Sequence, residues 1–182
     1  MSIEQESRYA FDSYAGMGPA HLPEDRWSAT QVLLARWEIE QFGYQLPAYA
    51  CLGVGEEAGE LLEAQTTEEV IDAVGDVLIF AAQLCTHFRV DLGTLVRLAG
   101  NATGSYDMFI AIGKLNHAVL KSAQRIRGYD DRERARIAVA HCMIGVIRGV
   151  ASFASDLDRA FFSTAETVMK RNWKINTQNG AA

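Results

Sequence analysis

The sequence predicts an all-α fold, in which a single domain forms a helical bundle. Only three prolines occur in the 182 residues, and all of them lie in the first quarter of the chain. The remainder can therefore be helical with little interruption. No run of alternating apolar and polar residues predicts a strand, and no internal repeat is present. With 49% hydrophobic residues the chain can build a core, so a helical bundle is expected.

Caps and breakers predict where the helices begin and end. Residues 28–31, Ser-Ala-Thr-Gln, have the pattern of a capping box, and Gly43 is expected to stop the helix that they open. Pro47 suits the first turn of the second helix, and Thr67 is expected to cap the third. Gly128 is expected to end the fourth long helix. The expected helices are 28–41, 47–65, 67–88, a short one at 91–99, 105–127, 131–153 and 157–174, with a loop at 101–104.

These helices define the domain organisation. Residues 1–24 are expected to form an irregular N-terminal arm, because they contain the run Gly-Met-Gly-Pro at 16–19. Residues 25–176 are expected to form one all-α catalytic domain. Residues 177–182 are expected to be a polar tail.

Composition excludes several classes of function. The net charge is -6 and the pI about 5.2, so a duplex-binding surface is not expected and nucleic acid is not an expected partner. No stretch reaches the roughly 18 uninterrupted apolar residues of a membrane span, so no membrane association is expected. The three cysteines are far apart, which indicates neither a zinc site nor a disulfide framework. The first residues lack the pattern of a signal peptide, and a cytoplasmic location is expected.

The strongest functional signal is a pair of acidic helices joined by about two residues. Such a short connection predicts an antiparallel hairpin. If the sequence is reflected about position 66, Glu60 falls level with Asp72. Glu56 then falls level with Asp76, and Glu57 lies one step away. Acids three or four residues apart share one helix face, so carboxylates are expected to converge between the two helices.

Converging carboxylates require a counter-charge. Two like charges at 4 Å repel by about 4 kcal/mol at an effective dielectric near 20. Asp76 lies in the apolar run Val-Gly-Asp-Val-Leu-Ile-Phe, residues 74–80, and an unpaired buried carboxylate is costly. A hard divalent cation would offset the repulsion, and Mg²⁺ is the usual one beside phosphates. The alternative is an ordinary solvated acidic face, which is the expected role of Glu63 and Glu68.

The acidic hairpin resembles the MazG-like all-α nucleoside triphosphate pyrophosphohydrolases, the group that includes dimeric dUTPases and dCTP pyrophosphatases. The pattern Glu57-x-x-Glu60 followed by Gly-Asp76-Val-Leu-Ile-Phe carries this resemblance, which covers roughly residues 30–90. The segments 113–128 and 168–174 are similar to phage-type members and to the family's basic last helix, respectively. The chain departs from the family at Ala73, where an acid usually stands. Either Asp72 or Glu69 is therefore expected to complete the set.

The resemblance implies a MazG-like helical bundle that hydrolyses nucleoside triphosphates to nucleoside monophosphate and pyrophosphate. It implies Mg²⁺ as the cofactor, for which Mn²⁺ is expected to substitute. A homodimer or homotetramer is expected, in the host cytoplasm if the protein is phage-encoded. Neither the base nor the sugar follows from the sequence, and dGTP or GTP stands beside dUTP and dCTP. The alternative from another class is a non-enzymatic helical oligomerisation or interaction module.

The expected site residues fall into three groups. The expected metal ligands are Glu57, Glu60, Asp72 and Asp76. The expected proton acceptor for the attacking water is Glu57 or Glu56. The third group consists of cationic and aromatic residues that could contact phosphate or base, with a solvated polar face or core packing as the alternative reading. Its members are Trp37, Lys114, His117, Lys121, Arg127, Lys170 and Lys174.

Overall fold

The computed structural model describes residues 13, 22–101, 107–178 and 180 of the chain. These ranges contain seven helices that are described along their whole length, and no strand. The predicted all-α fold is therefore confirmed. The N-terminal arm lies almost entirely outside the described residues, as do residues 102–104 of the predicted loop and the predicted start of the next helix at 105. Asn101, the first residue of the predicted loop at 101–104, is instead the last residue of a helix. The helices are α2 (Arg26–Phe42), α3 (Pro47–Glu63), α4 (Thr67–His87), α5 (Leu92–Asn101), α6 (Met108–Gln124), α7 (Arg132–Val150) and α8 (Leu157–Met169).

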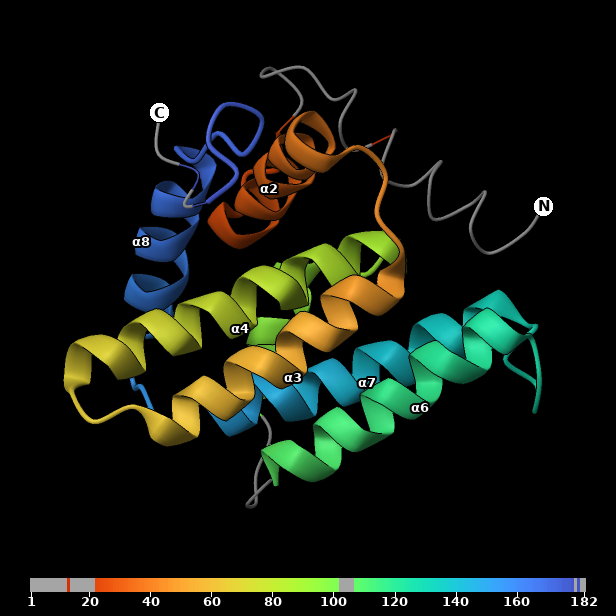
Figure 1. Cartoon of the computed structure of the whole chain (residues 1–182). Coiled ribbons are helices and arrows are strands. Elements are labelled where there is room, and N and C mark those ends of the chain that lie inside the picture. Colours follow the sequence, from red (N-terminus) through yellow and green to blue (C-terminus); the bar gives the residue numbers. More distant parts are fainter. Residues whose placement is uncertain (1–12, 14–21, 102–106, 179, 181–182) are drawn as a thin grey trace.

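The α3–α4 hairpin runs through the middle of the bundle (Figure 1). The second hairpin, α6–α7, lies along one side of it, and α2 and α8 lie across the other side. Because α4 contacts α2, α3, α5, α7 and α8, it is the central helix of the fold. Side chains on α3 and α4 are therefore held in place by the packing of these two helices against the rest of the bundle.

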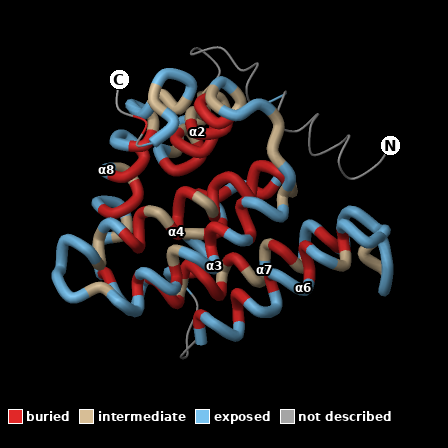
Figure 2. Tube along the Cα trace, in the orientation of Figure 1, coloured by how far each residue is buried: buried red, intermediate tan, exposed pale blue. Residues whose placement is uncertain are grey.

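The core lies where the helices face one another, and α4 contributes most to it (Figure 2). Val74, Val77 and Leu78 of α4 are fully buried, and Leu61 of α3 is only 2% exposed. By length and composition α4 could also cross a membrane, with a mean hydropathy of 1.4. In this fold 72% of that apolar window is buried by the other helices, as is usual for the core helix of a bundle.

The predicted capping box at the start of α2 is wrong by one turn. Asp25 is the N-cap, and its carboxylate accepts a hydrogen bond from the Ser28 backbone N–H at 2.9 Å. Gln31, which the sequence placed in the box, is instead buried against α4. It donates to Thr86 and to the Val90 carbonyl, and it accepts from the Leu92 N–H. A polar residue in the first turns of a helix can thus be buried in the core when its polar atoms form hydrogen bonds, as the three bonds of Gln31 do.

The C-terminal ends of several helices lie before the predicted ends, and those of α6 and α8 have consequences for the site. α6 ends at Gln124, because Arg125 adopts a left-handed conformation with φ 55° and closes the last turn. The predicted stop, Gly128, follows three residues later with φ 80°. α8 ends at Met169, five residues before the predicted end. Lys174, which the predicted helix at 157–174 included, therefore lies in the turns that follow α8.

Two glycines set how closely the central helices approach. A Cβ at Gly53 of α3 would collide with the Phe80 ring of α4. A Cβ at Gly75 of α4 would collide with the Thr164 side chain of α8. The first contact fixes the register of the hairpin, and the second seats α8 directly over the middle of α4. The chain that follows α8 therefore reaches the acidic part of the hairpin.

Candidate active site

The close contact between Gly53 and Phe80 decides which acids oppose each other. With those two residues level in an antiparallel pair, Glu57 falls level with Asp76. The predicted register was one residue off, since it placed Glu56 there. Electrostatics agree with the observed register, because Asp76 is the largest charged contributor to the raised pKa of Glu57. Glu56 is exposed and lies beside this pair rather than within it.

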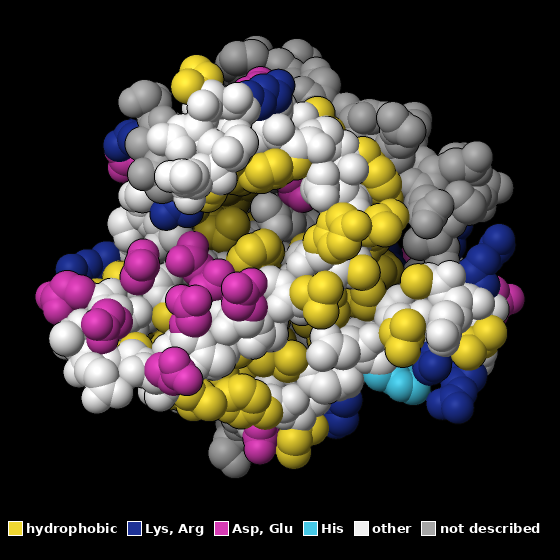
Figure 3. All heavy atoms as spheres, in the orientation of Figure 1, with side chains coloured by type: hydrophobic (Ala, Val, Ile, Leu, Met, Phe, Trp, Pro, Cys, Tyr) yellow, Lys and Arg dark blue, Asp and Glu magenta, His cyan; other side chains and the backbone are white. Residues whose placement is uncertain are grey.

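The acidic side chains form one patch on the surface of the hairpin (Figure 3). The patch borders a hollow between the α3–α4 hairpin and the layer of α2 and α8, and apolar side chains line part of this hollow. Glu57 and Asp76 are half-buried, whereas Glu60 and Asp72 are exposed. The patch therefore has an inner pair of carboxylates, shielded by the fold, and an outer pair that can move in solvent.

The inner pair is held in an unfavourable electrostatic state. Burial and the charges of Asp76, Glu60, Glu56 and Asp72 raise the pKa of Glu57 to about 7. Burial and the charge of Asp72 raise the pKa of Asp76 to about 6. Both effects penalise the charged forms, so the carboxylates lack sufficient counter-charge within the chain. A solvated acidic face would not show such shifts, because its charges would be screened by water.

Glu69, one of the two candidates to complete the set, is already engaged. Its carboxylate accepts the backbone N–H groups of Gln65 and Thr66 at 2.7 and 2.9 Å, and Thr66 caps α4 in return. These hydrogen bonds lower the pKa of Glu69. A carboxylate in a capping box stabilises its own helix start. This geometry favours Asp72 over Glu69 as the fourth acid.

The donor set suits a hard divalent cation, which prefers carboxylate oxygens. As placed, no three Asp, Glu, His or Cys side chains of the described ranges stand close enough together to enclose an ion. Glu60 and Asp72 are exposed, so they can turn toward Glu57 and Asp76 without disturbing the core. The hairpin thus offers four candidate ligands, and their arrangement around an ion would depend on the two outer side chains, Glu60 and Asp72.

Arg171 is the functional candidate that the sequence reasoning missed. It follows α8 directly, is exposed, and its positive charge lowers the pKa of Asp76. Its backbone is held by Trp37, whose indole N–H donates to the Arg171 carbonyl at 3.1 Å. In the sequence Arg171 lies between Lys170 and Lys174, and only the two lysines were predicted to contact the substrate. Lys170 points to Glu166, with which it pairs at 2.8 Å.

Trp37 has a structural role in this fold. It is 8% exposed, and its ring makes an edge contact with Phe42 at 5.7 Å between centroids. With its N–H engaged by Arg171, it anchors the C-terminal segment beside the acidic patch. The structure thus gives Trp37 a packing role beside the hollow, whereas the sequence analysis named it as a residue that could contact the base.

The cations of α6 and of the turn after it do not join the acidic patch within one chain. Lys121 donates to Gln124 of its own helix at 2.8 Å, and His117 makes an edge contact with Tyr129. Lys114 and Arg127 are exposed. None of the ion pairs found among the described residues connects these four residues to α3 or α4. The bundle places them on the far hairpin, so one subunit alone does not bring them to the site.

Comparison with known proteins matches the same segment. Residues 41–101, which include the whole of α3, α4 and α5, match the model of the phosphoribosyl-ATP pyrophosphohydrolase family. That family is a member of the MazG-like all-α nucleoside triphosphate pyrophosphohydrolase superfamily. These residues, about a third of the chain, are similar to that superfamily, and we call them the MazG-like core. No curated protein and no solved structure gave a match.

The MazG-like core carries all four acids and confirms the resemblance drawn from the sequence. Members of the matched family are pyrophosphohydrolases, which hydrolyse a phosphoric anhydride, and they generally use a divalent metal. α2, α6, α7 and α8 lie outside the matched residues. The roles of Trp37, Arg171 and the α6 cations therefore rest on geometry alone.

Proposed function

We propose that this protein hydrolyses nucleoside triphosphates to nucleoside monophosphate and pyrophosphate, with Mg²⁺ held by Glu57, Glu60, Asp72 and Asp76. The observation that carries this proposal is the half-buried Glu57–Asp76 pair, whose raised pKa values call for a cation, within a MazG-like core. Phosphoribosyl-ATP, named in the matched family, also carries a triphosphate and belongs to the same chemical class of candidates.

The chemistry is the attack of water on the α-phosphorus. Bound Mg²⁺ would neutralise charge on the phosphate oxygens and lower the pKa of a coordinated water. Glu57 lies at the centre of the acidic patch and is the proposed acceptor of the proton that this water loses. The bond between the α-phosphorus and its bridging oxygen breaks, and pyrophosphate leaves with the electron pair of that bond. Exposed Glu56 lies at the edge of the patch and is the second candidate for the proton.

We expect Arg171→Ala to raise KM or lower kcat by roughly tenfold to a hundredfold. A charge-assisted hydrogen bond to phosphate contributes about 1.5–3 kcal/mol, and about 1.4 kcal/mol corresponds to tenfold. Steady-state kinetics with the best triphosphate measure the effect. Lys170→Ala is the matched control, because Lys170 is adjacent in sequence but pairs with Glu166. Equal effects of the two substitutions would contradict a specific role for Arg171.

The remaining cations retain a proposed role through assembly. A triphosphate carries about four negative charges, and the charge of any bound metal is shared with the four carboxylates that hold it, so cations beyond Arg171 are expected near the phosphates. Lys114, His117, Lys121 and Arg127 on one subunit could reach the acidic patch of another, and Lys174 could act beside Arg171. Lys121→Ala, Lys174→Ala and Trp37→Ala, assayed over a panel of bases, separate these contributions. Wild-type kinetics in all three would place the phosphate and base contacts elsewhere.

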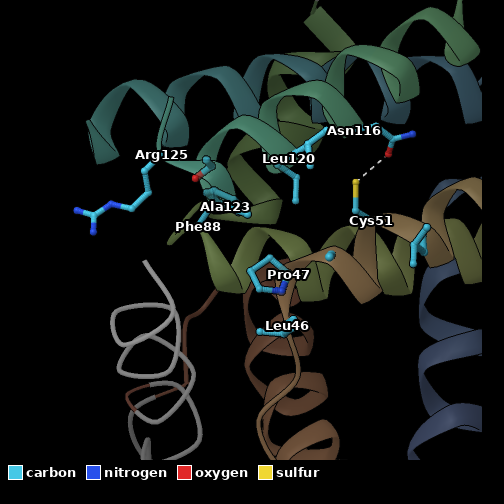
Figure 4. A pocket seen from close by; sticks show the side chains of 12 residues that line it. Leu46, Pro47, Cys51, Phe88, Asn116, Leu120, Ala123 and Arg125 are labelled. Atoms are coloured by element: carbon cyan, nitrogen blue, oxygen red, sulfur yellow. Dashed lines mark hydrogen bonds between the residues drawn. The ribbon is translucent and has the colours of Figure 1, made fainter. Parts of the chain in front are cut away.

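The surface of α3 and α6 is suited to contact a second copy of the chain. Between the two helices lies an apolar pocket of about 640 Å³, bordered by Leu46, Pro47, Phe88 and Leu120 (Figure 4). The Cys51 thiol donates to Asn116 at 2.9 Å along one wall. Large apolar side chains are exposed along the same helices. They are Tyr49, Leu52 and Leu62 on α3, and Phe109, Ile110 and Leu120 on α6.

We therefore expect a homodimer or homotetramer in which these apolar side chains are covered and the α6 cations of one copy approach the acids of the other. Leu52→Glu, at a side chain that is 70% exposed, should shift the protein to monomers and lower its activity. Light scattering at micromolar concentration measures this shift. Leu98→Glu on α5, 49% exposed, is the control and should leave assembly unchanged. A wild-type monomer with full activity would refute the proposal.

The decisive test of function is a panel of ribo- and deoxyribonucleoside triphosphates, with phosphoribosyl-ATP included. Phosphate is measured with and without added inorganic pyrophosphatase. We expect phosphate only when the second enzyme is present, because the first product is pyrophosphate. If no member of the panel is hydrolysed with Mg²⁺ or Mn²⁺, the alternative, a non-enzymatic helical interaction module, becomes the better account.

A further inference from the structure

The apolar pocket between α3 and α6 has no role in the proposed mechanism. Its volume, about 640 Å³, is within the range of sites that enclose small organic molecules. Figure 4 shows Leu46 and Pro47 on one side of the pocket and Leu120 and Ala123 on the other. The four acids of the proposed active site do not line it. What this pocket holds is therefore a question separate from the proposed function.

One buried polar atom in the lining of the pocket lacks a partner. Ser122 of α6 is only 1% exposed, and its Oγ makes no hydrogen bond with any of the described residues. Buried hydroxyl groups are nearly always hydrogen-bonded, because an unpaired one costs free energy. The Cys51 thiol, also in the lining, already donates to Asn116 at 2.9 Å. A molecule in the pocket would supply the partner that Ser122 lacks.

A positive charge stands at one end of the pocket. Arg125 follows α6 directly, is exposed, and extends outward beside Phe88 and Ala123 (Figure 4). Within the described part of the chain, no other residue of the lining is charged, and no ion pair includes Arg125. Its long side chain can turn toward the mouth of the pocket. An anionic group at this end would then meet a guanidinium, which can donate two parallel hydrogen bonds to a carboxylate.

The arrangement of these groups specifies the class of ligand. Along α6 the pocket extends from Asn116 to Arg125, which is about 13 Å at the rise of an α-helix. Between these ends the lining is mostly apolar, as at Val119 and Leu120. A nucleotide would lose hydrogen bonds to water here that the pocket cannot replace. A hydrocarbon chain that ends in a carboxylate fits both the apolar length and the charged end.

We propose that this pocket binds a medium-chain carboxylate, with its chain between α3 and α6 and its head group held by Ser122 and Arg125. These two residues stand three positions apart, so they reach the same end of the pocket. The Ser122 hydroxyl donates to one carboxylate oxygen, and the Arg125 guanidinium donates to the head group from the rim. Leu52 and Leu120 line the pocket and are exposed, so a second copy that covers them would enclose the bound ligand.

The test titrates the full-length protein, in its native assembly, with decanoate and with decanol by calorimetry. We expect one decanoate per chain, and decanol should bind roughly threefold to tenfold more weakly because it carries no charge. Arg125→Gln should remove this difference and leave the affinity for decanol unchanged. Ser122→Ala should weaken decanoate by roughly threefold to tenfold. It should also raise the melting temperature of the ligand-free protein, because the unpaired hydroxyl is removed.

A variant that fills the pocket supplies the control for location. Ala123→Phe adds a ring to the lining from an exposed position and should abolish saturable binding. Gln124→Phe is the matched control, because Gln124 is exposed on the same helix but lies outside the lining. It should bind decanoate as wild type does. Circular dichroism checks that both variants keep their helical content.

Several outcomes would overturn the inference. Equal binding by wild type and Ala123→Phe, or many decanoates per chain, would show adsorption outside the pocket. Equal affinities for decanoate and decanol would remove the role of Arg125 and the carboxylate with it. Failure of wild-type protein to bind decanoate would indicate that side chains of a second copy already fill the pocket. None of these results depends on whether the protein hydrolyses triphosphates.

Discussion

Replacing Glu60 or Asp76 by alanine is expected to lower turnover by on the order of a hundredfold or more. Each substitution removes a proposed metal ligand, and metal ions stabilise charge that develops on the phosphate in the transition state. Asp76 should show the larger effect, because it is half-buried and pairs with Glu57 in the observed register. Initial rates at saturating triphosphate and Mg²⁺ measure the loss.

Two kinds of control accompany these variants. Glu63→Gln and Glu68→Gln remove exposed acids at the end of the same hairpin and should keep near-normal rates. In the absence of metal, Asp76→Asn should melt at a higher temperature than wild type, because it removes a like charge from the patch. An intact fold with near-normal activity in Glu60→Ala or Asp76→Ala would show that these carboxylates do not hold the metal.

Removal of divalent metal by a chelator is expected to abolish activity and to reveal an unusual dependence of stability on pH. Glu57 has a folded pKa of about 7 against a reference value of 4.5, and Asp76 about 6 against 3.8. A raised folded pKa means that the protonated form is favoured by folding. The associated stability is complete below about pH 4 and is lost as the pH rises through 6 and 7. The metal-free protein should therefore melt at lower temperature at pH 7.5 than at pH 5.

Mg²⁺ should reverse this trend, because it binds the charged carboxylates. Ligand at a hundred times its Kd stabilises a protein by about 2.7 kcal/mol, and the gain should be larger at pH 7.5 than at pH 5. Melting curves with EDTA and with Mg²⁺ at both pH values measure this. Glu57→Gln is the matched variant and should flatten the pH dependence without metal. Full activity in EDTA, or stability that rises with pH in the metal-free protein, would exclude the metal site.

Local sequence predicted the starts of α3 and α4 well, whereas the predicted cap of α2 was wrong by one turn. Pro47 begins α3 as expected, and the start of α4 differs from prediction only in that Thr66, rather than Thr67, is the cap. Helix ends were less predictable. Arg125 closes α6 in a left-handed conformation that no glycine signals, and α8 stops at Met169 although the sequence beyond it remains compatible with a helix. In the structure Trp173 instead donates its N–H to Gln41 of α2, so a distant contact competes with helix continuation.

The sequence by itself determined the all-α class and the acidic hairpin, and it predicted a metal-binding role for the carboxylates. These follow from short-range patterns, namely helical spacing, caps and a connection too short for any arrangement but an antiparallel pair. Tertiary structure alone decided that Glu57 opposes Asp76, because the contact of Gly53 with Phe80 sets the register. It also brought Arg171 to the acids through Trp37, across 134 positions of sequence. Such contacts depend on how whole helices pack, and packing at that distance leaves no periodic signal in the chain.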